Sequence, residues 1–236
     1  MNLRLQELSF TLYARDLNPA TISPAILRYV EIVPADWALV ENPVHSDREL
    51  KLVFNNRVRL IVQPNRAFFA ETVGDKKLED IQIPTIVENY LKIFSGVNYQ
   101  AMSVAPSGFK AFESDSAVSE YLAEKLLTSD PWQKFDDRSL NAIGIKLGYP
   151  YKSGNFYLDI NQANVEMANV NTPAVWFAGN FNYPLLSNSK QEKILSCHQL
   201  LQQWQTDVVK FIDFIDRKFL ASVAAPEFSV FPSNNL

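Results

Sequence analysis

The chain has 236 residues, of which 47 % are hydrophobic and 20 % are charged. This balance, together with 16 Phe, 9 Tyr and 4 Trp, excludes a disordered chain and allows a sizeable core. The formal net charge is −4, with 22 basic and 26 acidic residues spread along the chain, so nucleic acid is disfavoured as a partner because phosphate binding needs a concentrated basic surface.

The first half of the chain is predicted to be mostly β-structure. Residues 8–14 alternate between apolar and polar side chains, which indicates a strand. Residues 49–71 predict a meander of three strands. Its first turn is predicted to be the three-residue loop 55–57, because that register pairs Leu52 with Leu60 and places Arg57 at the left-handed position. The second turn is predicted at residues 64–65.

Both faces of this predicted meander carry apolar side chains. Leu52 and Leu60 share one face, whereas Val53, Ile61 and Phe68 share the other. A sheet with one face in water does not have this pattern, so a helix, the other half of the chain or a partner is expected to cover the second face. Five basic residues make the same hairpin locally basic: Arg57, Arg59 and Arg66, with Lys51 and Arg48. A cationic, half-apolar face suits an acidic protein partner or an anionic ligand; charges that protect an edge strand are the alternative.

Helices and a second set of strands follow. Helices are predicted over residues 84–94 and 116–127, with an extended segment from 99 to 112 that is broken at 106–108. Strands are predicted over residues 143–149, 156–160 and 175–183, with Gly179 at a bulge or a close approach. One long helix is predicted over residues 189–220, and its apolar arc widens at Phe211 and Phe214, where it could carry a subunit interface.

These elements predict an α+β fold with two antiparallel β-meander halves, each followed by helix, and a long C-terminal helix packed on the sheet. We expect a single domain over residues 1–236, which two duplicated halves (1–115 and 138–220) could compose. A tail follows at 221–236. Its Phe228 and Phe231 make the tail suited to docking on its own domain or to adding a strand to a neighbour.

Few residues suggest catalysis, a metal or a cofactor. Cys197 is the only cysteine and lies beside His198 on a predicted helix, where the two side chains point about 100° apart, so they cannot form a dyad. No zinc ligand set or phosphate-binding glycine loop occurs, and no cofactor is expected. The alternative is an acid site at Asp159 and Glu166, because carboxylate pairs can converge from separate positions.

The compartment is predicted from two further absences. No apolar run approaches the roughly 18 to 20 residues that cross a bilayer, and the first seven residues lack the apolar core of a secretory signal. A single cysteine can form no intrachain disulfide, so an oxidising compartment gains no support. We therefore expect a cytoplasmic protein without membrane insertion.

The order of elements resembles a sporadically distributed family of bacterial proteins of unassigned function. The run Leu158-Asp159-Ile160-Asn161 and His198, followed by aromatic residues toward Phe219, carry the resemblance. That family tends to have a second acid where this chain has Asn161. The resemblance implies the same succession of meander, helix, meander and long helix, and it implies no catalytic residues.

The sequence thus favours a non-catalytic protein–protein interaction or assembly subunit that acts as an oligomer or in a complex. The expected interaction residues are Val53, Arg57, Arg59, Ile61, Phe68, Phe211, Phe214, Phe228 and Phe231. The alternative is a small-molecule-binding protein, or a carboxylate-based hydrolase, with a cleft between the two halves.

Overall fold

The computed structural model describes residues 3–15, 17–127, 131–136, 138–140, 142–167 and 169–221. Its strands are β1 (Arg4–Arg15), β2 (Val44–His45), β3 (Leu50–Val53), β4 (Val58–Gln63), β5 (Arg66–Thr72), β6 (Asn98–Ala111), β7 (Lys134–Phe135), β8 (Arg138–Ser139), β9 (Gly144–Tyr151), β10 (Gly154–Met167) and β11 (Val170–Pro184). Its α-helices are α1 (Pro24–Tyr29), α2 (Ile83–Ile93), α3 (Asp115–Glu120), α4 (Lys190–Gln202) and α5 (Trp204–Phe214). Shorter helical turns are η1 (Pro19–Thr21), η2 (Leu78–Asp80), η3 (Tyr121–Leu126), η4 (Pro131–Gln133) and η5 (Ile215–Phe219).

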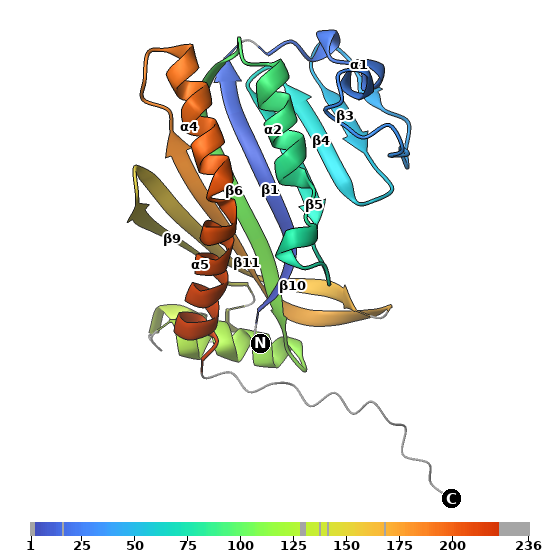
Figure 1. Cartoon of the computed structure of the whole chain (residues 1–236). Helices are drawn as coiled ribbons and strands as arrows, with labels where there is room; N and C mark the ends of the chain where they lie inside the picture. The colour runs from blue at the N-terminus through green and yellow to red at the C-terminus, as the bar shows by residue number, and fades with distance from the viewer. Residues whose placement is uncertain are drawn as a thin grey trace, which may run out of the picture.

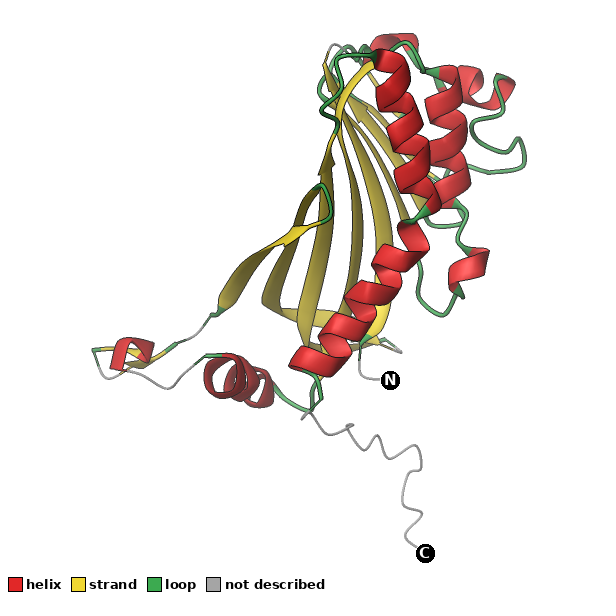
Figure 2. Ribbon diagram, turned by 60° about the vertical axis from the view of Figure 1, so that its left-hand side comes forward, coloured by secondary structure: helices red, strands yellow, loops and turns green. Residues whose placement is uncertain are grey.

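The architecture is α+β, as predicted, with one antiparallel sheet of nine strands in the order β2-β3-β4-β5-β1-β6-β11-β10-β9. Helices α2, α4 and α5 lie against one face of this sheet (Figures 1 and 2). The alternate residues of β1 that point at these helices, Leu8, Phe10 and Leu12, are fully buried. The core therefore lies between the helices and this face of the sheet.

The β1–β6 pair lies in the middle of the sheet, with four strands beyond β1 and three beyond β6. On one side, β1 pairs with β5, the last strand of the first meander; on the other, β6 pairs with β11, the last strand of the second. A helix follows each central strand, and another follows each meander. In this arrangement β6 opens the second set of elements, whereas the sequence prediction assigned residues 98–111 to the first half. Duplication itself stays a prediction.

The first meander has the predicted register. Leu50 pairs with Val62 and Leu52 with Leu60, which confirms the three-residue loop at 55–57. Arg57 occupies the left-handed region with φ of 67°, as that loop requires. The second turn also has the predicted register, since Ile61 pairs with Phe68.

Two predicted elements were wrong in detail. Residues 98–111 form one continuous strand rather than a broken one; Gly108 serves close packing, since a Cβ there would lie 2.4 Å from the Arg4 carbonyl oxygen. The predicted long helix begins after the cap Ser189 as expected, but it is interrupted at Gln203 (φ −99°, ψ 1°). Figure 2 shows the axis changing direction there, and this bend lets both α4 and α5 contact β6.

Gly179 in β11 is a close-approach glycine, as predicted. A Cβ at this position would lie 2.8 Å and 3.0 Å from two ring carbons of Phe211, and 3.2 Å from Phe156. We expect Gly179→Ala to lower the free energy of unfolding by about 1 to 3 kcal/mol, because the ring of a fully buried phenylalanine must move. Urea unfolding measures this loss.

The control for Gly179→Ala is Gly96→Ala, where an added Cβ meets nothing within 4 Å. The control should change stability by less than about 0.5 kcal/mol. Adding Phe211→Leu to Gly179→Ala should cost less than Phe211→Leu costs alone, since the smaller side chain makes room. Equal stability of Gly179→Ala and the unmodified chain would show that α5 does not press on β11.

Candidate functional site: two apolar depressions beside α5

Helix α5 is flanked by two depressions, one on each side. The first, which we call the aromatic pocket, has a cavity volume of about 260 Å³ and lies between α5 and strands β9, β10 and β11. Its lining is almost entirely aromatic, with one lysine. The lining residues are Tyr149, Tyr151, Phe156, Phe181, Lys210, Phe211 and Phe214.

Strand register brings the rings of the aromatic pocket together. Phe156 of β10 lies opposite Tyr149 of β9 on one side and Phe181 of β11 on the other. The ring centroids are 6.0 Å apart for Phe156 and Tyr149, and 4.5 Å apart for Phe156 and Phe181. Phe214 closes the pocket from α5, with its ring edge-on to Tyr149 at 5.6 Å. Such a pocket is suited to a large apolar or aromatic group.

A buried carboxylate next to the aromatic pocket holds the side chain of Tyr151, which lines the pocket. Asp207 of α5 is fully buried, and it accepts hydrogen bonds from the hydroxyls of Tyr183 (2.6 Å) and Tyr151 (2.9 Å) and from the Lys152 ammonium group (3.0 Å). Burial, followed by the hydrogen bond to Asp207, raises the pKa of both tyrosines well above the usual value. Both phenols therefore remain protonated donors, and the carboxylate ties α5 to two strands.

Two lysines give the aromatic pocket a cationic rim. The Nζ atoms of Lys152 and Lys210 lie 5.0 Å and 5.1 Å from the centroid of the Tyr151 ring. Lys210 also donates a hydrogen bond of 3.2 Å to the Tyr151 hydroxyl. The charge of Lys152 is balanced by the carboxylate of Asp207, with which it forms an ion pair. Lys210 forms no ion pair with any other residue that the structure describes. The rim of the pocket is therefore suited to an anionic group.

Strand β9, which carries two walls of the aromatic pocket, is the last strand of the sheet. Its inner edge pairs with β10 from Gly144 to Tyr151, and no described strand pairs with its outer edge. An edge strand presents unpaired backbone N–H and C=O groups that an extended segment can use. The pocket and the free edge are thus adjacent.

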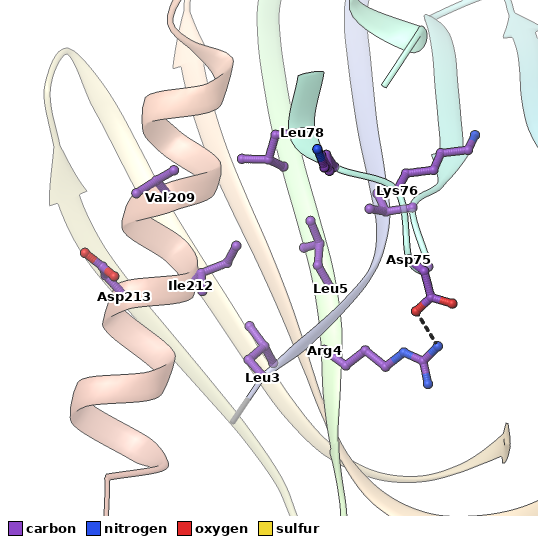
Figure 3. A pocket seen from close by; sticks show the side chains of 12 residues that line it. Leu3, Arg4, Leu5, Asp75, Lys76, Leu78, Val209, Ile212 and Asp213 are labelled. Carbon is purple, nitrogen blue, oxygen red and sulfur yellow. Dashed lines mark hydrogen bonds and ion pairs between the residues drawn. The ribbon is translucent and has the colours of Figure 1, made fainter. Parts of the chain in front are cut away.

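The second depression, which we call the groove, lies on the opposite side of α5 and has a cavity volume of about 700 Å³. In Figure 3, Val209 and Ile212 of α5 stand on one side, Leu3 and Leu5 lie between, and the connection that carries Leu78 forms the other side. The remaining residues that line the groove are Arg4, Val73, Gly74, Asp75, Lys76, Lys77 and Asp213.

The groove exists because of a β-bulge and a gap between helices. The β1–β6 register shifts between Leu5 and Glu7, so Leu3 and Leu5 face the helices together with Leu8. The alternative function, a small-molecule-binding protein or a hydrolase, requires a cleft between the two halves of the chain. The groove lies where elements of the first half meet α5. Its two carboxylates, Asp75 and Asp213, are largely exposed, which offers no support for an acid-catalysed hydrolase.

The structure places the predicted interaction residues at separate sites. Phe211 and Phe214 line the aromatic pocket. Phe228 and Phe231 lie outside the described residues. The remaining five belong to the first meander: Val53, Arg57, Arg59, Ile61 and Phe68.

The second face of the meander is neither solvent-exposed nor fully buried. Val53, Ile61 and Phe68 are each half-buried, and the described helices that pack on the meander lie on its other face. Arg59 on this face forms an ion pair with Glu7, and burial raises the pKa of that glutamate while Arg59 opposes the rise. Of the basic residues of this hairpin, Arg59 and Lys51 are therefore already paired, Lys51 with Glu41 at 2.9 Å.

The structure does not bring the alternative acid residues together. Asp159 and Glu166 are seven positions apart on the continuous strand β10, about 23 Å along the chain, and they point to opposite faces. Asp159 lies 3.5 Å from Lys146 on the neighbouring strand. The two carboxylates therefore cannot share a proton, and an acid site that uses either of them stays a prediction.

The sequence interpretation missed most of the aromatic pocket and its buried acid. Tyr149, Phe156 and Phe181 come from three strands, and only the strand register brings them together. Asp207 carried a usable signal, because it lies at helical spacing between Trp204 and Phe211 on the apolar stripe. An acid at such a position needs buried partners.

The part of the chain that the structure describes has neither a metal cluster nor a membrane-crossing helix. The described residues contain no cluster of His, Cys, Asp and Glu that could hold a metal ion. Of the helices in the described ranges, none is both long and apolar enough to cross a membrane. Comparisons of the chain with protein-family models and with curated proteins find no match.

Proposed function

We propose that this chain is a non-catalytic protein-interaction module that binds an extended acidic segment of a protein partner at the aromatic pocket and the edge of β9. The observation that carries the proposal is a pocket of six aromatic side chains with a lysine rim beside an unpaired strand edge. The edge supplies backbone hydrogen bonds, and the pocket supplies the anchor for one side chain.

The charges indicate which segment fits. Lys152 and Lys210 lie at the rim of the pocket, in the turn after β9 and in α5, whereas Lys146 of β9 faces the opposite side of the sheet and pairs with Asp159. Acidic residues beside a buried aromatic anchor are complementary to these charges and speed association. An aromatic anchor in a desolvated pocket contributes most of the binding energy at such interfaces. We therefore expect an aromatic residue flanked by Asp or Glu.

A displayed library of random 12-residue peptides, selected on the full chain, tests this proposal. We expect enriched peptides to contain an aromatic residue next to an acidic one. Fluorescence polarisation with an enriched peptide should then show that Tyr149→Ala weakens binding by at least about tenfold, because a wall of the pocket is lost. Lys210→Glu should also weaken binding, whereas Lys218→Glu, also on the C-terminal helical segment but outside the pocket, should not.

The matched control for Tyr149→Ala is Tyr157→Ala. The two tyrosines are 37 % and 39 % exposed and lie on neighbouring strands, but Tyr157 faces the opposite side of the sheet. Loss of stability should therefore be similar, while only Tyr149→Ala should affect the peptide. Equal effects of the two substitutions, or a selection without enrichment, would contradict the proposal.

A further inference from the structure

The groove has an apolar surface that the described chain leaves uncovered. Val209, on its wall, is 46 % exposed, although it belongs to the helix that packs on the core. Leu5, Leu78 and Ile212 are each only half-buried. A groove of about 700 Å³ lined by these side chains lies within the size range of binding sites.

The segment 222–236 begins where the described chain leaves the groove. Helix α5 lines the groove from Val209 to Asp213, and the described chain ends at residue 221, after η5. The backbone N–H of Leu3 donates a hydrogen bond of 2.8 Å to Asp216 of η5. This bond holds the β1 side of the groove against the last helical turn, next to the point at which residues 222–236 start.

Chain length permits a return to the groove. From Ile212 to the last helical residue, Phe219, the chain advances about 11 Å, at about 1.5 Å per residue, and Ala221 follows two residues later. The seven residues from Ala221 to Phe228 span up to about 23 Å when extended. Phe228 can therefore reach the level of Ile212, and a tether this short gives an effective concentration on the order of millimolar.

The composition of the segment matches the groove. Residues 222–236 include the apolar side chains Phe228, Val230 and Phe231, and their single charged residue is Glu227. On the rim of the groove, Arg4 pairs with Asp75 at 2.9 Å (Figure 3), and the exposed Lys77 pairs with Glu79 at 3.5 Å. The apolar side chains that follow Glu227 therefore match the apolar part of the groove, which Leu5, Leu78, Val209 and Ile212 form.

We propose that residues 222–236 fold back along α5 and place Phe228 and Phe231 in the groove of the same molecule. The volume favours the groove, at about 700 Å³, over the aromatic pocket, at about 260 Å³. The aromatic pocket thereby remains open for a partner, and this inference does not depend on the proposed function.

A thiol placed on the groove wall tests this inference in the full chain. Val209→Cys puts a reactive group in the groove, while the native Cys197 stays buried, where burial raises its pKa to about 12 and slows alkylation. We expect iodoacetamide to modify the thiol of the Val209→Cys variant at least about fivefold faster when Phe228→Ser and Phe231→Ser are added. The reason is that residues 222–236 no longer dock in the groove and shield the thiol.

The matched control is Leu195→Cys on α4, at a position that is 61 % exposed and lies outside the groove. Its thiol should be modified at the same rate with or without Phe228→Ser and Phe231→Ser. Protection at Val209→Cys should also be independent of protein concentration. Protection that grows with concentration would assign the occupant to a second copy and overturn the proposal. Equal rates with the unmodified and the substituted tail would overturn it as well.

Discussion

Asp207→Ala should lower the free energy of unfolding by about 3 to 5 kcal/mol, as expected when one partner of a buried charge network is removed. Tyr183 is 1 % exposed, and in the variant its hydroxyl loses the acceptor of its hydrogen bond. Tyr151 loses the hydrogen bond to Asp207 that orients its ring. Lys152 is left without its carboxylate beside two aromatic rings. Urea unfolding followed by circular dichroism measures the change.

Two comparisons make the Asp207 prediction specific. Asp213→Ala, six residues along the same helix but at the surface, should change stability by less than about 0.5 kcal/mol. Tyr183→Phe should cost about 1 to 2 kcal/mol alone and much less in the Asp207→Ala background, because the two groups share one hydrogen bond. Additive losses would show that this bond does not contribute to stability.

Glu71→Ala should have an effect of similar size, about 3 to 5 kcal/mol, at the other end of the helical layer. Glu71 is fully buried in β5, and one carboxylate oxygen accepts hydrogen bonds of 2.8 Å from the backbone N–H groups of Gln82 and Ile83. The other oxygen accepts a bond of 2.6 Å from Lys76. The carboxylate thereby caps the start of α2, where an anion is favoured by the helix dipole.

The control for Glu71→Ala is Glu79→Ala on η2, an exposed acid whose removal should be nearly neutral. Glu71→Gln should fall between the two, because the amide keeps an acceptor for the helix but loses the charge that pairs with Lys76. The midpoint temperatures of thermal unfolding measure the three stabilities, which we expect to rise from Glu71→Ala through Glu71→Gln to Glu79→Ala. A Glu71→Ala variant as stable as Glu79→Ala would show that α2 needs no cap from the sheet.

The fold class and the first meander could be predicted because burial allows only one register. A slip of one residue would turn Leu52 and Leu60 to the other face, so the sequence pattern chose the three-residue loop even though Arg57 had to adopt positive φ. Gly179 was predicted at a bulge or a close approach, because glycine inside a strand is typical of these two cases, and the structure shows the close approach.

The interruption at Gln203 and the aromatic pocket could not be predicted from the sequence. No proline or glycine marks the interruption, and on either side of it α4 and α5 both contact β6. Phe211 and Phe214 were predicted from the apolar arc of one helix, but their partners come from strands up to 65 positions away. Local periodicity carries no information on such distant pairs.

The central place of the first strand has a consequence for synthesis on the ribosome. Once residue 72 has emerged, β1 can pair with β5, but its second edge has no partner until residues 98–111 follow. During that interval the nascent chain presents a strand of twelve residues with an open side, the kind of surface on which chains aggregate. The helix α2, which is made in between and packs on β1 and β5, stabilises the half-built sheet until β6 closes it.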